Sequence, residues 1–251
     1  VIVTGGSMGI GEAISSAFAQ SNAHVYVADV NPPSDEPPPN ARCVTYLNCD
    51  TASETDCKTV VEKVIQEQGA VDVLVNNAAI QPPESYQPID RVSSKTWQRM
   101  IDVNLCGYMR MAAAVLPYMK QQQSGVIINL ASGQAHRTAR EVGVYGPIKS
   151  ANVMQARQWG VEYARDGIRI LSVSPGAINT PMIRASLAEQ GGGAALANRH
   201  PIGRIGEPHE VASAVLWLTS DAASFITATD LEVDGGLGAL GSFADPYPMP
   251  K

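Results

Sequence analysis

The sequence has no apolar run approaching the roughly 20 residues that a membrane-spanning helix needs. Lysine and arginine form no cluster, and the net charge at pH 7 is −6, which argues against a nucleic-acid partner. The four cysteines form no Cys-x-x-Cys pair and no metal-binding spacing with the four histidines. We therefore expect buried, reduced thiols in a cytoplasmic protein that has no metal ion and no membrane or nucleic-acid partner.

Internal repeats, low-complexity tracts and a composition shift that would mark a second domain are also missing from the sequence. The 251 residues fit one α/β domain, and an apolar content of 45% is enough for a sizeable core. Val1 lies within an expected strand and is not preceded by methionine. We expect the natural start to lie upstream, which leaves a targeting peptide open.

Strand-like and helix-like segments alternate along nearly the whole chain. The alternation predicts a three-layer, doubly wound α/β fold with a central parallel sheet of about seven strands. Pro117 is expected to kink or divide the third predicted helix. Helices are expected over 9–21, 53–68, 94–123, 145–164 and 208–218, and strands over 1–3, 24–28, 44–47, 71–75, 126–130, 168–173 and 231–233.

Three segments do not follow this alternation. Residues 32–39 contain five prolines and are expected to form a loop. Residues 185–197 are rich in alanine and glycine, and we interpret them as a mobile helical lid within a substrate-lid segment at about 180–207. The C-terminal tail, 237–251, contains too much glycine and proline for a helix.

The first predicted turn contains the sequence VTGGSMGIG between a strand and a helix, from Val3 to Gly11. In this context Gly5 permits a sharp exit from the strand, Gly9 allows close approach of the backbone to a ligand, and Gly11 allows close helix packing. A pyrophosphate can then lie at the helix N-terminus. The segment therefore predicts a dinucleotide site.

The acidic residue Asp29 ends the second predicted strand, 18 residues after Gly11. This is close to the spacing at which a carboxylate binds both ribose hydroxyls of NAD. Its negative charge repels the 2′-phosphate of NADP, and the neighbours Met8, Val30 and Asn31 supply no cation. We therefore expect NAD as the cofactor.

These motifs together resemble the short-chain dehydrogenase/reductase family over nearly the whole chain, in the family's order and spacing. They are Thr4-Gly-x-x-x-Gly-Ile-Gly11, Asn76-Asn77-Ala78, Asn104, Ser132, Tyr145-x-x-x-Lys149, Pro175-Gly176 and Thr180. The resemblance implies an NAD(P)-binding Rossmann fold. Two positions depart from the usual pattern: Ala79 replaces a glycine, and Pro147 stands between the tyrosine and the lysine. Because proline costs about 3 kcal/mol inside a helix but loses no hydrogen bond in the first turn, we expect that helix to begin at about Val144 or Tyr145.

The tyrosine and lysine suit proton transfer. A carbonyl that accepts a hydride also needs a proton, and a tyrosine with its usual pKa of about 10 is a poor base near neutrality. An ammonium one helical turn away lowers that pKa. By resemblance, Tyr145 is the acid/base, Lys149 lowers its pKa and binds the nicotinamide ribose, Ser132 orients the substrate oxygen, and Asn104 supports a water-linked proton relay.

The resemblance also implies which residues bind the cofactor. Asp50 is expected to meet the adenine, Asn77 and Ala78 to flank its ribose, and Ile178 and Thr180 to contact the carboxamide end. The full expected set is Gly5, Ser7, Gly9, Ile10, Gly11, Asp29, Asp50, Asn77, Ala78, Tyr145, Lys149, Pro175, Gly176, Ile178 and Thr180.

The sequence says less about the substrate. Gln134, His136, Arg137 and Arg140 either meet a polar or anionic substrate or form a solvated loop, and Met182, Ile183 and Leu187 give the lid an apolar inner face. We expect a medium-sized, partly apolar alcohol or ketone, and a homotetramer or homodimer.

Three other functions stay open. They are a non-redox isomerase, dehydratase or cyclase on the same fold, a cofactor-sensing binding protein, and a nucleotide-binding methyltransferase. The intact Tyr145 and Lys149 favour the oxidoreductase.

Overall fold

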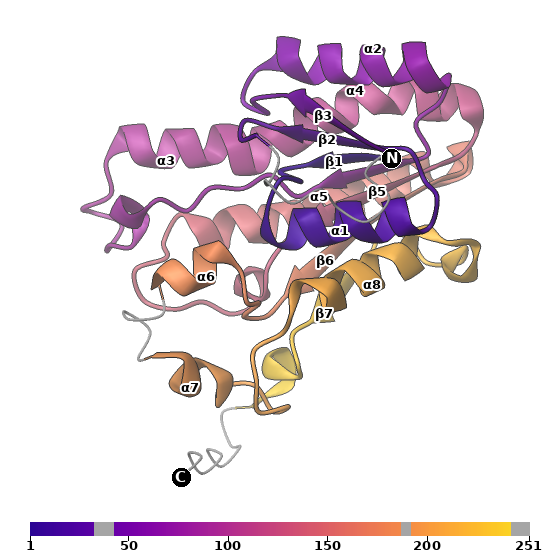
Figure 1. Cartoon of the computed structure of the whole chain (residues 1–251). Helices are drawn as coiled ribbons and strands as arrows, with labels where there is room; N and C mark the ends of the chain where they lie inside the picture. The colour runs from indigo at the N-terminus through magenta and orange to yellow at the C-terminus, as the bar shows by residue number, and fades with distance from the viewer. Residues whose placement is uncertain (33–42, 187–191, 242–251) are drawn as a thin grey trace.

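Seven parallel strands form one sheet, in the order β3-β2-β1-β4-β5-β6-β7 (Figure 1). This computed structural model describes residues 1–32, 43–186 and 192–241. The strands are β1 (Ile2–Thr4), β2 (Val25–Asp29), β3 (Val44–Asn48), β4 (Val73–Asn76), β5 (Gly125–Leu130), β6 (Ile168–Pro175) and β7 (Asp230–Val233). The helices are α1 (Gly9–Gln20), α2 (Glu54–Gln68), α3 (Ser94–Ile101), α4 (Gly107–Gln122), α5 (Tyr145–Tyr163), α6 (Pro181–Ser186), α7 (Gly192–Ala197) and α8 (Pro208–Thr219). The predicted doubly wound parallel sheet is confirmed.

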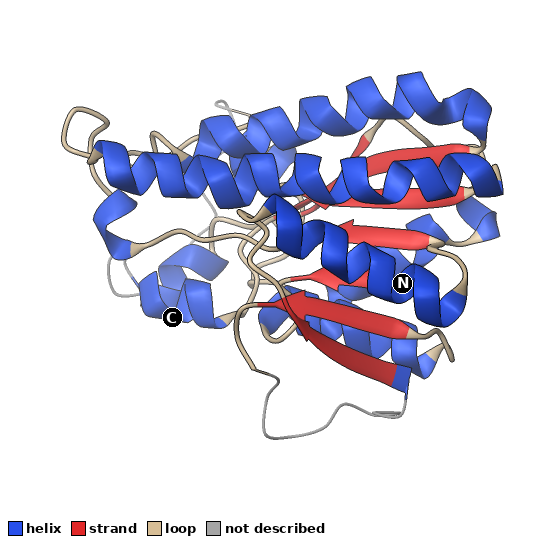
Figure 2. Cartoon of the chain, turned by 90° about the horizontal axis from the view of Figure 1, so that it is seen from above, coloured by secondary structure: helices blue, strands red, loops and turns tan. Residues whose placement is uncertain are grey.

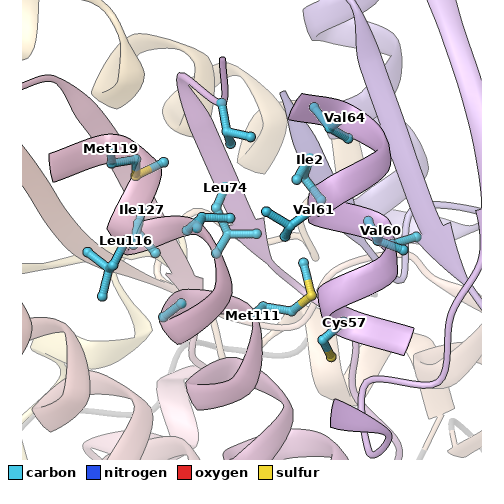
Figure 3. Close-up of a cluster of buried hydrophobic side chains, with 14 of the residues drawn as sticks. Ile2, Cys57, Val60, Val61, Val64, Leu74, Met111, Leu116, Met119 and Ile127 are labelled. Atoms are coloured by element: carbon cyan, nitrogen blue, oxygen red, sulfur yellow. The ribbon is translucent and has the colours of Figure 1, made fainter. Parts of the chain in front are cut away.

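Helices cover both faces of the sheet (Figures 1 and 2). One face packs against α1 and α8, which also contact each other. The other packs against α2, α4 and α5, where Ile2, Leu74 and Ile127 of the sheet meet Val61 of α2 and Met111 of α4 (Figure 3). Each such side chain stabilises the fold by about 1.5–3 kcal/mol when fully buried.

Local signals set the ends of two predicted helices. The Ser53 hydroxyl accepts the amide of Asp56 at 3.2 Å and caps α2, and Gly69 ends the helix with a φ of +74°. In α5, Tyr145 is the first residue and Pro147 the third. The proline therefore costs no intrahelical hydrogen bond, and the predicted start of this helix is confirmed.

The long helix expected over 94–123 is interrupted elsewhere than predicted. A π-helical segment, Asp102–Cys106, separates α3 from α4, whereas α4 continues through Pro117. Pro117 therefore does not divide the helix, and the alternative, that it kinks the helix, stays a prediction. Both Pro117 and Ala113, whose carbonyl loses its hydrogen bond, are exposed, so water can satisfy that carbonyl. The buried neighbours Val115 and Met119 hold the helix against the sheet.

The carboxyl ends of the strands gather the functional segments at one edge of the sheet. The order reverses between β1 and β4, which is where ligands bind in open α/β sheets. The segment predicted as a lid contains α6 and α7, while 187–191, including Leu187, lie outside the described residues. So do most of the proline-rich stretch, 33–42, and the end of the tail, 242–251. Within the described ranges, none of the helices is long and apolar enough to cross a membrane.

Candidate active site

The turn after β1 has the backbone geometry that its glycines predict. Gly5 and Gly9 have φ values of +63° and +59°, in the left-handed region. A side chain at Gly11 would place its Cβ 2.2 Å from the carbonyl oxygen of Gly5. Gly11 therefore lets the first turn of α1 pack on the loop itself, and the free amides at the start of α1 lie beside this loop.

Asn77 fixes this turn to the end of β4. Its Nδ2 donates to the carbonyl oxygens of Thr4 at 3.0 Å and Gly5 at 2.8 Å. The Thr4 hydroxyl accepts the amides of Asn77 at 3.0 Å and Ala78 at 3.1 Å. Thr4 was not among the predicted site residues, although it opens the glycine motif. Together these bonds keep the two switch-point strands in register at the site.

Asp29 is buried at the end of β2 and already oriented. One carboxylate oxygen accepts the amide of Ser7 at 3.0 Å, and the other accepts the amide of Asn31 at 2.9 Å. The second oxygen also accepts Nδ2 of Asn31 at 3.2 Å, so the oxygen bonded to Ser7 is the one that keeps a lone pair for a further donor. Ser7 itself is buried and lines neither of the two cavities described below.

A second acidic residue, Asp50, follows β3 and lines the same cavity as Asp29. One of its oxygens forms an ion pair with Arg99 at 2.9 Å, and the other accepts the amide of Ala52 at 2.9 Å. Arg99 comes from α3, 49 residues further along the chain, and sequence reasoning missed it. No local signal could have found this contact, because it depends on how α3 packs.

Tyr145 and Ser132 meet at the centre of the site. Ser132 follows β5, and its hydroxyl is hydrogen-bonded to the Tyr145 phenol and also accepts the amide of Gln134 at 3.2 Å. Burial raises the pKa of Tyr145, nearby Tyr86 raises it further, and the bond to Ser132 lowers it. In the chain alone, burial therefore has the larger effect on the pKa of Tyr145, whereas we expected Lys149 to lower that pKa.

Lys149 lies one helical turn after Tyr145 and is buried. Its ammonium donates to the carbonyl oxygen of Leu130 at 2.7 Å and to the Tyr108 hydroxyl at 3.2 Å. The nitrogen is 5.6 Å from the centre of the Tyr145 ring. Burial lowers the pKa of Lys149 to about 7. An ammonium has three protons, so one remains for a ligand.

Tyr108 is a member of the site that the sequence did not indicate. It comes from α4, is 1% exposed, and donates its hydroxyl proton to the Leu130 carbonyl at 2.9 Å. Its oxygen can therefore accept from Lys149. A lone tyrosine on an apolar helix face is normally a core residue, so the sequence does not predict a place for Tyr108 in the active site.

Asn104 is a buried residue of the π-helical segment. The Asn104 side chain exchanges two hydrogen bonds of 2.8 Å with the backbone of Ile80. The backbone carbonyl oxygen of Asn104 accepts a hydrogen bond from Nδ2 of Asn152 at 3.0 Å. The side chain thus faces Ile80 rather than Lys149. The predicted relay through Asn104 stays a prediction.

Two adjoining cavities share Tyr145 in their walls. The first, which we call the cofactor cavity, runs from the glycine turn to Lys149. The second, the substrate cavity, holds about 710 Å³ and contains Ser132. Of the predicted cofactor residues, Gly5, Gly9, Ile10, Gly11, Asp29, Asp50, Asn77, Ala78, Tyr145, Lys149, Pro175 and Thr180 line the cofactor cavity, whereas Gly176 and Ile178 line only the substrate cavity.

The cofactor cavity fits a nicotinamide dinucleotide. The glycine turn leaves backbone amides free for a pyrophosphate, and Asp29 keeps an acceptor for a ribose hydroxyl. At the other end, the buried Lys149 has a proton left for the second ribose. The described residues thus supply partners for the pyrophosphate and for both riboses of such a molecule.

The chain is similar to known proteins over nearly its whole length. A family model described as enoyl-(acyl carrier protein) reductase matches residues 5–238. The chain is 37% identical over 244 residues to 2,5-dichloro-2,5-cyclohexadiene-1,4-diol dehydrogenase from Sphingobium indicum, covering 96% of this chain and 97% of the relative. It is 33% identical to cis-4-hydroxycyclohexanecarboxylate dehydrogenase from Sinomonas cyclohexanicum, covering 95% and 96%. The ligand-free structure of aldohexose dehydrogenase from Thermoplasma acidophilum superposes with a TM-score of 0.90 at 34% identity, covering 98% and 96%.

Proposed function

The chain belongs to the short-chain dehydrogenase/reductase family of oxidoreductases, and we propose that it uses NAD(H) to interconvert a secondary alcohol and its ketone. The observation that carries the proposal is the position of Tyr145. Its phenol is bonded to Ser132, lies near the buried ammonium of Lys149, and borders both cavities. A bound nicotinamide supplies the hydride acceptor for oxidation and the hydride donor for reduction.

The chain's own residues handle the proton and the orientation of the substrate. Ser132 orients the substrate oxygen by hydrogen bonding. Tyr145 takes the hydroxyl proton during oxidation and returns it to the carbonyl oxygen during reduction. Lys149, when protonated, stabilises the Tyr145 phenolate. Asn104 supports a water-linked path that carries the proton away behind Lys149.

Asp29 supports NAD rather than NADP. A 2′-phosphate on the adenine ribose would lie against its buried carboxylate. Among the described residues that line the cofactor cavity, the cations are Arg99 and Lys149. Arg99 is paired with Asp50, and Lys149 lies at the catalytic end. No described cation is therefore available beside Asp29 for that phosphate.

The substrate cavity supports a medium-sized, partly apolar substrate. Its volume of about 710 Å³ falls in the usual range for small-molecule sites. Val142, Ile178, Ile183 and Leu196 form apolar parts of its wall. Both curated relatives described above are named for substrates with a hydroxylated six-carbon ring, and a ring of that size suits this cavity.

The test is to follow NADH and NADPH absorbance with a panel of cyclic secondary alcohols and their ketones. We expect turnover with NAD(H), and a loss of about 1,000-fold or more in Tyr145→Phe with NADH affinity retained. Cofactor binding without turnover across the panel would favour a sensing protein. Substrate conversion without any change in NADH would favour an isomerase, dehydratase or cyclase.

We also propose a cytoplasmic homotetramer. Exposed apolar side chains on α4 and α5 support association, among them Met109, Met154 and Val161, since such groups on helices commonly mark interfaces. Four free cysteines suit a reducing compartment. Light scattering at working concentration tests the assembly, and a monomer there would reject it. Cell fractionation tests the location.

A further inference from the structure

We infer that the substrate carries a carboxylate, and that Arg140 binds it. This inference rests on the proposed function, because it assigns the substrate class for the same site. Arg140 and the catalytic hydroxyls of Ser132 and Tyr145 line the same substrate cavity. A single molecule in that cavity can thus present an alcohol to Tyr145 and an anionic group to Arg140.

The cavity wall contains more basic than acidic side chains. Arg137, Arg140 and Arg199 face two acids, Glu141 and Asp234. This excess is opposite in sign to the net charge of −6 for the whole chain. A positive cavity in an acidic protein attracts anionic ligands and rejects cationic ones.

Two of these charged groups already have partners near the end of the described chain. Asp234 accepts the amides of Gly236 and Gly238, the first at 2.9 Å. Arg137 donates to the carbonyl oxygen of Gly238. These bonds shape the turn after β7.

Arg140, in contrast, makes no hydrogen bond and no ion pair with any residue in the part of the chain that the structure describes. It is exposed at the cavity, on the loop between Ser132 and α5. A guanidinium binds a carboxylate through two parallel hydrogen bonds, which suits this group to a carboxylate better than to a neutral oxygen.

His200 does not add to the charge. It is 2% exposed, its Nε2 accepts the amide of Ala177 at 3.1 Å, and its Nδ1 lies 3.0 Å from the carbonyl oxygen of Leu196. Since Nε2 accepts, Nδ1 carries the proton and the ring is neutral. The cations that can meet the substrate are therefore the arginines.

The rest of the wall limits what carries the carboxylate. Ile178, Ile183, Leu196 and Val142 are apolar and line the same cavity as Arg140 and Tyr145. A short hydrophilic acid would leave these side chains without contact. The geometry favours a carboxylic acid whose alcohol and carboxylate are joined by a hydrocarbon framework, such as a ring.

Two matched probes test the inference: 4-hydroxycyclohexanecarboxylate and its carboxamide, which has the same shape without the charge. For the wild type we expect kcat/KM with NAD to favour the acid by at least about 10-fold at low ionic strength, mainly through KM. Added salt should reduce this ratio. In Arg140→Gln the ratio should fall toward one, and Arg140→Lys should restore it in part.

Arg165→Gln is the matched control, because Arg165 is exposed beyond the opposite end of α5 and lines neither cavity. It should keep the wild-type ratio. Equal turnover of acid and amide by the wild type, or a ratio unchanged in Arg140→Gln, would overturn the inference and leave the proposed function intact.

Calorimetric binding to the NAD-loaded protein separates the two claims, with cyclohexanecarboxylate and cyclohexanecarboxamide as probes that have no alcohol to oxidise. Tighter binding of the carboxylate that Arg140→Gln removes supports the inference even without turnover. Equal or undetectable binding of both contradicts it.

Discussion

The Lys149 ammonium donates a hydrogen bond of 3.2 Å to the hydroxyl of Tyr108, a residue on a different helix and 41 positions earlier in the chain. Both groups share the Leu130 carbonyl as acceptor. Burial raises the pKa of Tyr108 well above its usual range, so this phenol stays neutral and acts on Lys149 as a dipole. The Tyr108 hydroxyl thus positions the Lys149 ammonium, whose positive charge stabilises the Tyr145 phenolate.

Replacing Tyr108 with Phe should move the pH profile of alcohol oxidation. The groups facing the Lys149 ammonium are the Tyr108 hydroxyl, the Leu130 carbonyl and the Tyr145 ring. Loss of the hydroxyl removes an acceptor from the ammonium, so the pKa of Lys149 falls further and the Tyr145 phenolate is less stabilised. We expect the alkaline rise of kcat/KM to shift upward by about one pH unit.

The pH profile and the Tm together distinguish a change in the pKa of Lys149 from a loss of folding. The Tm of Tyr108→Phe should change little, because the ring still fills the core. A variant with an unshifted profile, or one that merely loses activity equally at every pH, would contradict a positioning role for Tyr108.

Lys149 is expected to cost stability. Burial lowers its pKa from 10.5 to about 7, so between pH 7 and 10.5 the unfolded chain binds a proton that the folded chain does not. Wild-type stability from this group therefore rises with pH across that window. Lys149→Met should be inactive yet more stable at pH 7, by about 2 kcal/mol or roughly 5 °C in Tm.

Melting curves of the two proteins without cofactor, at pH 7 and pH 10, check this. The gap in Tm should narrow at the higher pH as the wild-type amine becomes neutral. A less stable methionine variant, or a gap that does not depend on pH, would argue against a buried ammonium here.

The cofactor preference should reverse when the charge at the end of β2 is changed. Asp29→Ala combined with Asn31→Arg removes the carboxylate and places a cation beside the ribose. We expect the ratio of kcat/KM for NAD over NADP to fall by about 100-fold or more. Initial rates with both cofactors measure the ratio, and a wild type that prefers NADP would refute the role given to Asp29.

Gly11→Ala should abolish cofactor binding. The added Cβ would lie 2.2 Å from the Gly5 carbonyl oxygen, and that turn cannot move away because Asn77 binds Gly5. Gly193→Ala is the control, since nothing lies within 4 Å of its added Cβ. NADH fluorescence titration should show at least about 100-fold weaker binding in the first variant and little change in the second. Near-normal binding by Gly11→Ala would show that the turn is not packed as described.

Features that depend on residues close together in the chain could be predicted from the sequence. The strand-turn-helix at Gly5 to Gly11 predicted the first turn, and the spacing of Tyr145 and Lys149 predicted that both belong to one helix face. The position of Pro147 even predicted where α5 begins, because a proline in the first turn of a helix loses no hydrogen bond.

Residues brought together by packing were not predictable in this way. The Arg99–Asp50 ion pair and the Tyr108–Lys149 hydrogen bond join segments more than 40 residues apart. At Pro117 the local rule failed because tertiary contacts of its buried neighbours sustain the helix. Burial of Tyr145, which raises its pKa, was likewise not predictable from the spacing of Tyr145 and Lys149.

The proposal that a hydride passes directly between substrate carbon and nicotinamide can be tested by isotope transfer. The protein is incubated with NAD and a cyclic secondary alcohol carrying deuterium on the carbinol carbon, and the NADH formed is analysed by mass spectrometry. The account predicts one deuterium in the dihydronicotinamide ring, and almost no labelled NADH with Tyr145→Phe. Unlabelled NADH, or ketone formed without NADH, would contradict it.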